Sequence, residues 1–262
     1  MTLDPDERAA TATEFGVADA QVERDYLISL ILGHLSSTHA ESPIFFGGTA
    51  LARTHLPNGR LSEDIDLIAI TPRSRLAAEL TRTLPRSVQR QFGRLEWETS
   101  LSAVIDTEPA RLITRDGRIG LKIQLLSRTG TTRWPTEPRR LTQRYRNAPP
   151  ATLCVPTRPA FATAKAVAWY DRAAPRDLWD LWALATINAI DHEAATLFQR
   201  LGPTNKPPQP RQFATAPSEA QWHAQLAGQT RLEVTAAHAL CLVRDAWTSA
   251  APPPDRQRPM PN

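Results

Sequence analysis

Cysteine and long apolar runs are scarce in this chain of 262 residues. Its two cysteines, Cys154 and Cys241, are too few for a disulfide framework or a zinc site. No run of about 18 apolar residues occurs, so we expect no transmembrane helix. The first 14 residues are polar and acidic, without the apolar stretch of a signal peptide. These absences lead us to expect a protein of the reducing cytoplasm with no membrane partner.

Lysine is also rare, since only Lys122, Lys165 and Lys206 are lysines among 31 basic residues. In so arginine-rich a chain, a retained lysine is a weak sign that arginine would not serve at that position. The net charge of +4 is compatible with a nucleic-acid partner without requiring one. With 41% hydrophobic and 22% charged residues, the chain has the composition of a globular protein with one or two domains.

A short apolar run, Ile44 to Phe46, stops at the pair Gly47-Gly48 and passes into the helix-favouring residues Ala50 to Ala52. This pattern predicts a strand that turns into a helix. Such a turn presents backbone N–H groups and the positive end of the helix, which together suit a phosphate group.

Two carboxylates follow, with Asp64 and Asp66 alternating with Ile65 and Leu67. Strand residues two apart point to the same face, so both carboxylates should project together. Because like charges at this spacing repel, a cation would stabilise them, and Mg²⁺ suits paired carboxylates and substrate phosphates. The alternative interpretation is a glycine turn beside a solvated, aspartate-rich strand edge. The two features in this order favour a nucleotide and metal site.

The stretch Gly47-Gly48-Thr49-Ala50-Leu51, followed by Arg60, Ser62, Asp64 and Asp66, resembles the first motif of the abortive-infection (AbiEii/AbiGii-type, MenT-like) nucleotidyltransferase toxins. These toxins belong to the DNA polymerase β-like nucleotidyltransferase superfamily. The resemblance continues at Lys165 and residues 176–180, and so spans about residues 20 to 200. It implies an α/β (α+β) fold, in which a polymerase β-like mixed sheet with helices precedes a helical C-terminal half.

The resemblance also implies an activity, namely transfer of a nucleoside monophosphate from an NTP to an RNA acceptor. The implied acceptor is the 3′ end of tRNA, where the addition would block aminoacylation, and the implied metal is Mg²⁺ (or Mn²⁺). A cognate antitoxin would be the protein partner. Two alternatives stay open: transfer to a protein or a small molecule such as an antibiotic, and a catalytically weak nucleotide-binding module.

The residues that match the family motif give the predicted site. The predicted catalytic residues are Asp64, Asp66, Lys165 and Asp180, with Asp64 and Asp66 as metal ligands. The predicted nucleotide-binding residues are Gly47, Gly48, Thr49, Arg60, Ser62, Lys165 and Asp177. Lys165 lies on an otherwise apolar helical stripe, and Asp177 and Asp180 share an arc of the next helix. Without the resemblance, these three residues could equally form a structural ion pair.

The polymerase β-like pattern usually adds a third carboxylate from a later strand, where this chain has Gln124. A neutral amide can orient a ligand, but it cannot act as a base or neutralise a metal ion. Either Asp180 supplies the third acid, or the site works with two carboxylates.

The expected organisation is a flexible tail (1–16), a nucleotidyltransferase α/β domain (17–150), a helical domain (151–248) and a disordered proline-rich tail (249–262). We expect helices at 18–38, 73–91 with a kink at Pro85, 160–172, 175–188, 192–201 and 218–247. Strands are expected at 44–46, 64–70, 95–105, 111–115 and 118–126, the last two joined by the hairpin turn Asp116-Gly117.

Six arginines lie between Ser127 and Pro150, with Trp134 and Tyr145 among them. The segment is too rich in proline and charge to be predicted as core. It is either a strip that tracks RNA phosphates and offers a stacking face, or a solvated loop.

Overall fold

The computed structural model describes residues 2–251, which form two compact units. The sheet unit contains the chain up to Thr157 together with Leu226–Leu232, and the helical unit contains Arg158–Gln225 and the chain from Glu233. The expected boundary at residue 150 is therefore too early, because the last strand of the sheet, β7, ends at Pro156. The sheet unit also recruits a short segment from near the C-terminus, which the sequence did not predict.

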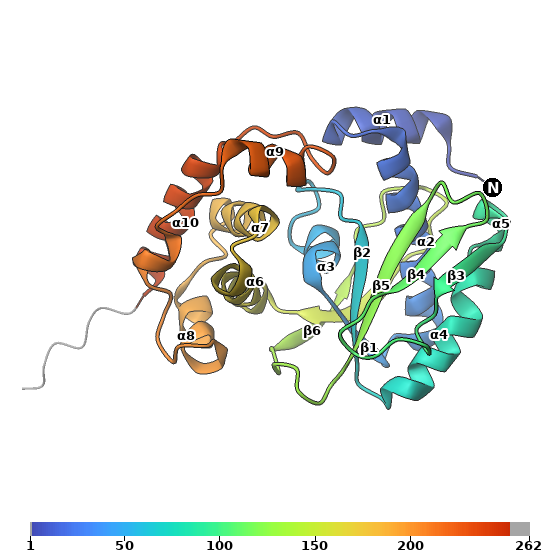
Figure 1. Ribbon diagram of the computed structural model, residues 1–262, viewed down its shortest axis with the longest axis horizontal. Coiled ribbons are helices and arrows are strands. Elements are labelled where there is room, and N and C mark those ends of the chain that lie inside the picture. Colours follow the sequence, from blue (N-terminus) through green and yellow to red (C-terminus); the bar gives the residue numbers. More distant parts are fainter. Residues whose placement is uncertain (1, 252–262) are drawn as a thin grey trace, which may run out of the picture. The chain divides into compact units, whose positions relative to one another are not determined.

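A mixed sheet of seven strands forms the first unit in the described part of the chain, in the order β3-β4-β5-β2-β1-β7-β6 (Figure 1). The strands are β1 (Pro43–Phe46), β2 (Asp64–Ala69), β3 (Leu95–Thr99), β4 (Ala110–Thr114), β5 (Gly120–Ser127), β6 (Thr136–Arg140) and β7 (Thr152–Pro156). β2 runs antiparallel to β1 and parallel to β5, while β1 and β7 are parallel. The predicted mixed sheet is confirmed, and each of the five expected strands has a counterpart in it. The strand expected at 95–105 ends at Thr99, because the chain turns at residues 101–104.

The strands β6 and β7 were missed because their sequences carry weak strand signals. β6 contains Pro138, which cannot donate to a ladder, and it is tolerated there because β6 is an edge strand. β7 is short and lies between prolines, although it pairs with β1 at Ile44 and Cys154.

Helices cover the sheet unit: α1 (Pro5–Phe15), α2 (Asp19–His39), α3 (Gly47–Thr54), α4 (Arg73–Ser87) and α5 (Gln89–Phe92). α2 and α4 pack against strands of the sheet and against each other, and α3 packs on β1 and β2. The expected helix 73–91 includes Pro85 and breaks at Val88, between α4 and α5.

The structure contradicts the tail expected at residues 1–16, because residues 5–15 form α1. Asp4 caps the N-terminus of α1 through its carboxylate, and Gly16 ends the helix in the left-handed conformation with φ 66°. α1 packs on α2. The sequence did not predict α1, because residues 5–15 are mostly polar and lack a clear apolar stripe.

The helical unit contains α6 (Arg158–Arg172), α7 (Pro175–Thr186), α8 (His192–Leu201), the 3₁₀ helix η1 (Pro210–Phe213), α9 (Glu219–Leu226) and α10 (Ala236–Ala250). The predicted hairpin of α6 and α7 is confirmed, and α10 packs on α7. The single helix expected at 218–247 is instead two helices, because residues 227–235 leave the helical path. Most of the proline-rich tail predicted at 249–262 lies outside the described residues.

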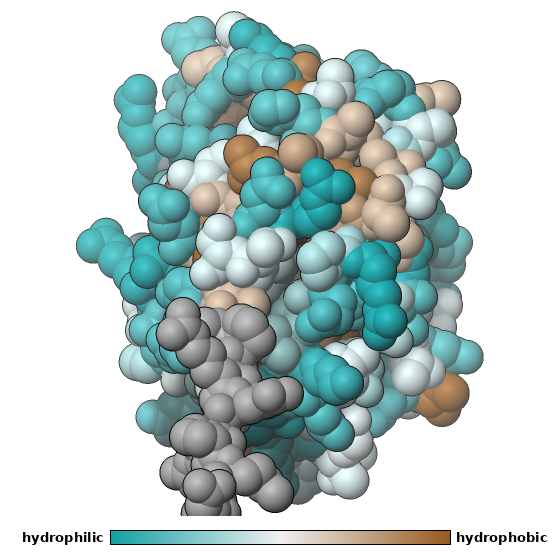
Figure 2. Space-filling view, turned by 90° about the vertical axis from the view of Figure 1, so that its left-hand side faces the viewer, coloured by the Kyte–Doolittle hydropathy of each residue, from teal (hydrophilic) through white to brown (hydrophobic). Residues whose placement is uncertain are grey.

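Among residues 2–251, no helix combines the length and apolar character needed to cross a bilayer. Figure 2 shows one face of the molecule, where hydrophilic residues cover most of the surface and apolar residues gather in its upper part. This mixture is typical of a protein surface that faces water.

Candidate active site

Gly47 brings the backbone of the turn against the carboxylate of Asp66. β1 pairs with β2 so that Phe46 lies opposite Asp66, and the chain then turns into α3 through Gly47 at φ 78°. A Cβ atom added at Gly47 would overlap the Oδ2 atom of Asp66. Glycine is required here for two reasons, since other residues rarely adopt this φ and none would leave room for the carboxylate.

Gly48 makes room for a different group, the guanidinium of Arg60. A Cβ atom at Gly48 would lie 2.5 Å from Nη2 of Arg60 and 3.4 Å from Oγ of Ser62. Both side chains are buried, Arg60 at 4% and Ser62 at 8% exposure. The structure therefore brings together the glycine pair, Arg60, Ser62 and Asp66, as the sequence motif predicted.

Thr49 fixes the helix to the neighbouring strand. Its hydroxyl donates a hydrogen bond to the backbone carbonyl of Asp64, and its side chain is 2% exposed. This contact ties the first turn of α3 to the first residue of β2, so the Thr49 side chain has a structural role.

The two aspartates lie on one face of β2, where both are half-buried, while Ile65 and Leu67 between and beside them are fully buried. Gln124 lies beside Asp66 on β5, in the place predicted for a third carboxylate, and its amide donates to the Thr107 carbonyl. No cluster of three or more histidine, cysteine or acidic residues at metal-binding spacing occurs within residues 2–251. The pair nevertheless fits Mg²⁺, which uses one or two carboxylates and completes its shell with phosphates and water. Because Gly47 has no Cβ atom, the carboxylate of Asp66 can lie against the turn, where phosphates would bind.

Gln229 is the buried residue at this site that the sequence did not indicate. It is 4% exposed and accepts a hydrogen bond from Arg60. Its segment was predicted to be helical, and Gly228 was the only local signal of a break.

Lys165 lies in a buried ion cluster within the helical unit. Its Nζ is 2.6 Å from Oδ2 of Asp180 and 3.3 Å from Oδ1 of Asp177. Asp177 also accepts two hydrogen bonds from Arg172, at 2.7 and 3.0 Å. The three residues predicted here are therefore in contact, in the ion pair that the sequence left open as a structural alternative.

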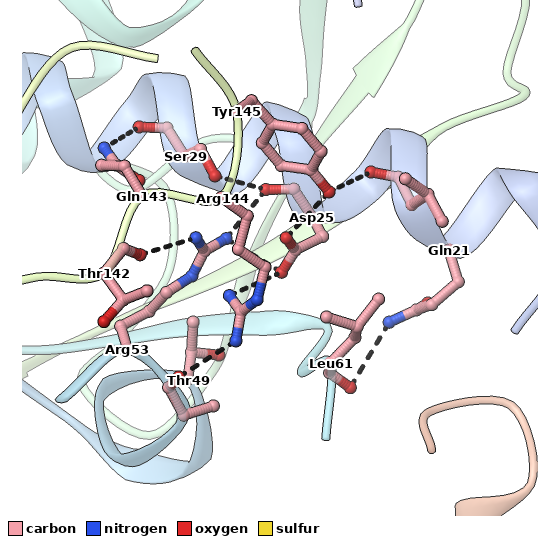
Figure 3. Close-up of polar contacts among 12 residues, drawn as sticks. Gln21, Asp25, Ser29, Thr49, Arg53, Leu61, Thr142, Gln143, Arg144 and Tyr145 are labelled. Carbon is pink, nitrogen blue, oxygen red and sulfur yellow. Dashed lines mark hydrogen bonds and ion pairs between the residues drawn. The ribbon is translucent and has the colours of Figure 1, made fainter. Parts of the chain in front are cut away.

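Arg144 and Tyr145 do not belong to an exposed arginine strip, so that prediction is wrong for both. Tyr145 is 2% exposed, and its hydroxyl donates to Oδ2 of Asp25 at 3.0 Å. Figure 3 shows Asp25 of α2 beside Arg53 of α3, with Arg144 and Tyr145 close by. Arg53 lies 2.8 Å from the Asp25 carboxylate, and Arg144 donates to the carbonyls of Ala52 and Pro57. These side chains join the segment to α2 and α3.

The other arginines of that segment are dispersed. Arg139 and Arg140 lie on the edge strand β6, where Arg139 contacts His55 and Glu137. Arg146 is exposed and pairs with Glu7 of α1. The segment thus serves mainly to connect elements of the sheet unit.

A cavity of about 530 Å³ lies elsewhere in the sheet unit, bordered by α1, α2, α5 and the β4–β5 hairpin. Its lining includes Arg8, Arg94, Arg115 and Arg118 together with Glu23 and Asp116. None of the residues predicted to bind metal or nucleotide lines it.

The mixed sheet, together with a glycine turn that faces paired aspartates, defines a nucleotidyltransferase fold. The chain belongs to the nucleotidyl transferase AbiEii toxin family of type IV toxin–antitoxin systems, whose family model matches residues 31–248. The resemblance read from the sequence is thereby confirmed.

Solved structures share this fold. The chain is similar to MenT4, a nucleotidyltransferase toxin from Mycobacterium tuberculosis, with a TM-score of 0.62 and 21% identity over 93% of this chain and 89% of that chain. It is also similar to JHP933 from Helicobacter pylori, with a TM-score of 0.54 and 15% identity over 88% of this chain and 92% of that chain. A search among curated proteins finds no match.

Proposed function

We propose that the protein transfers a nucleoside monophosphate from an NTP to a terminal hydroxyl of RNA, the 3′ end of tRNA. The observation that carries the proposal is the close approach of the Gly47-Gly48 turn to Asp66 and Arg60. This arrangement would place a phosphate-binding turn beside carboxylates that could hold a metal ion. Membership of the toxin family supports a nucleotide substrate and a cognate antitoxin.

The reaction would join the acceptor oxygen to the α-phosphorus of the NTP, break the bond to the pyrophosphate oxygen, and release pyrophosphate and the hydroxyl proton. Asp64 and Asp66 would hold Mg²⁺, and Mn²⁺ would suit the same ligands. When bound, the ion would neutralise charge on the phosphates and favour the deprotonated acceptor. Phosphoryl transfer depends mostly on positioning and charge stabilisation, which this site offers through Arg60 and the backbone of the glycine turn.

The test is incubation of the purified protein with each labelled NTP, Mg²⁺ and total RNA, followed by nuclease or protease digestion of the labelled product. Asp64→Asn and Asp66→Asn should abolish labelling while the melting temperature stays equal or rises, because one of two repelling carboxylates is removed. Retained labelling in both variants would contradict the metal site, and label that survives nuclease but not protease would identify a protein acceptor.

Gln124 favours a second candidate function, a nucleotide-binding module that transfers slowly or not at all. The amide occupies the place of a third carboxylate and is engaged with Thr107. Binding of NTP without labelling of any acceptor would support this candidate. Gln124→Glu should then increase transfer or change the metal preference.

A further inference from the structure

The 226–232 segment (Leu226–Leu232) links α9 to α10, yet it belongs to the sheet unit. There it lies against the loop that leads into β2. The backbone N–H of Leu61 donates to the Gln229 carbonyl at 2.8 Å, and the Thr230 hydroxyl donates to the Gly59 carbonyl at 2.9 Å. The segment thus holds the stretch that carries Arg60 and Ser62.

The side chain of Gln229 joins two residues of opposite charge. Its Oε1 accepts a hydrogen bond from Nη1 of Arg60 at 2.6 Å, and its Nε2 donates to Oε2 of Glu63 at 3.2 Å. Glu63 in turn pairs with Arg24 of α2 at 3.2 Å. A primary amide can accept and donate at once, whereas a carboxylate would face Glu63 with a like charge.

The other end of the Arg60 guanidinium reaches the phosphate seat, since Nη2 lies against Gly48. Gln229 is neutral, so it fixes the guanidinium without cancelling its charge. A side chain that is already fixed loses less conformational entropy when it binds a ligand. Burial of both residues excludes water that would compete for the same hydrogen bond.

We propose that Gln229 is a positioning residue, which holds Arg60 at the Gly47-Gly48 turn for the triphosphate of the NTP. The inference rests on the proposed function for its substrate. It gives the 226–232 segment a defined role in nucleotide binding.

The first test is steady-state kinetics on full-length variants at saturating RNA. Gln229→Ala should raise the KM for NTP about ten-fold and change kcat less than about two-fold, because the triphosphate is bound less well in the ground state and transition state alike. Gln229→Glu keeps an acceptor for Arg60 but adds negative charge, so its KM should rise at least as much, and most at low salt. Thr230→Val removes the hydrogen bond to the Gly59 carbonyl but keeps the contact of Gln229 with Arg60, so it is the matched control for a general loosening of this loop.

A double-mutant cycle separates positioning from general support of the fold. If Gln229 acts through Arg60, Gln229→Ala should add nothing to the KM of Arg60→Ala. Melting temperatures of all variants are measured alongside. The inference would be overturned if Gln229→Ala raised the KM for NTP equally in the wild type and in Arg60→Ala. It would also be overturned if Thr230→Val raised this KM as much as Gln229→Ala does.

Calorimetric titration with inorganic triphosphate and Mg²⁺ distinguishes failure of the inference from failure of the proposed function. Weaker triphosphate binding by Gln229→Ala than by Thr230→Val, with no transfer by the wild type, would uphold the inference and reject the proposed function. Equal binding by all three proteins would reject the inference, whether or not transfer occurs.

Discussion

The two adjacent glycines of the turn serve different side chains. Gly47 combines a left-handed backbone with contact to the carboxylate of Asp66, so a larger residue would strain the backbone and displace Asp66. Gly48 has an ordinary backbone, and its nearest neighbours are side-chain ends, the guanidinium of Arg60 and the hydroxyl of Ser62, which can shift more easily than backbone atoms. The same substitution should therefore have different consequences at the two positions.

Gly47→Ala should abolish metal-dependent transfer and lower the free energy of unfolding by more than about 1 kcal/mol, because the left-handed conformation is costly with a Cβ. Gly48→Ala should displace Arg60, raise the KM for NTP and cost less stability. Denaturant titration and transfer kinetics on both variants check this. Wild-type transfer by Gly47→Ala would contradict the site geometry.

Lys165 also calls for a single-residue test, because it neutralises buried carboxylates whether or not it binds substrate. Lys165→Met should lower the free energy of unfolding by about 3–5 kcal/mol, since it removes the ammonium group 2.6 Å from the buried carboxylate of Asp180. Asp177 keeps its two hydrogen bonds from Arg172. Adding Asp180→Leu should therefore restore most of the stability.

Transfer activity in this pair of variants separates the two roles. If Lys165 or Asp180 acts on the substrate, the stable double variant should remain inactive. A double variant with both stability and transfer restored would show that the cluster is structural.

At the scale of the elements, the buried carboxylate of Asp25 on α2 joins α3 and the segment after β6 to that helix. Burial lowers the pKa of Arg53 to about 10, with Asp25 opposing the shift, so Arg53 remains cationic at neutral pH and needs that partner. Burial, then the charge of Asp25, raises the pKa of Tyr145, which keeps its hydroxyl protonated as a donor. Arg144 adds a cation–π contact with Phe15 of α1, at 5.3 Å from the ring centroid.

Arg144→Ala should lower the free energy of unfolding by about 3 kcal/mol, because it leaves the Ala52 and Pro57 carbonyls without their donor. Arg140→Ala, on the exposed edge strand, should change it by less than about 0.5 kcal/mol. Chemical denaturation gives both values. Equal, small effects would return Arg144 to the exposed strip that the sequence suggested.

Features whose residues lie close together in the sequence could be predicted, whereas contacts between distant parts of the sequence could not. The glycine turn, Arg60, Ser62 and the two aspartates lie within 20 residues of one another. Strand periodicity and turn chemistry pointed to the turn and the aspartates, and the resemblance to the family motif added Arg60 and Ser62. The partners of buried Arg144 and Gln229 lie far away in the chain, and no local pattern shows that such polar residues will be enclosed. Edge strand β6 and the break between α9 and α10 were missed for a related reason, since tertiary pairing decided them.

At the scale of the whole molecule, the described residues include a second group of arginines, which lies outside the segment that the sequence singled out. Arg115 and Arg118 on the β4–β5 hairpin are exposed and border the 530 Å³ cavity together with Arg94. The hairpin leads into β5, which runs parallel to β2 with Lys122 beside Asp64. Arg115 and Arg118 thus lie toward the end of the sheet at which β2 begins with Asp64.

Replacing Arg94, Arg115 and Arg118 with Ala should raise the KM for RNA and flatten its salt dependence by up to about two units of slope, because phosphate contacts release counterions. The KM for NTP should not change. The matched control, Arg75, Arg82 and Arg86 to Ala on α4, removes the same charge. Equal effects of the two triple variants would show that net charge alone governs RNA binding.

The return of the 226–232 segment to the sheet has a consequence for protein synthesis. Arg60 and Gln229 are 169 residues apart, and the ribosome makes the N-terminal part first. A nascent chain of 225 residues already contains the glycine turn and both aspartates, but not the amide that holds Arg60. The hydrogen bond that holds Arg60 can therefore form only after residue 229 has been made, well after the glycine turn and both aspartates.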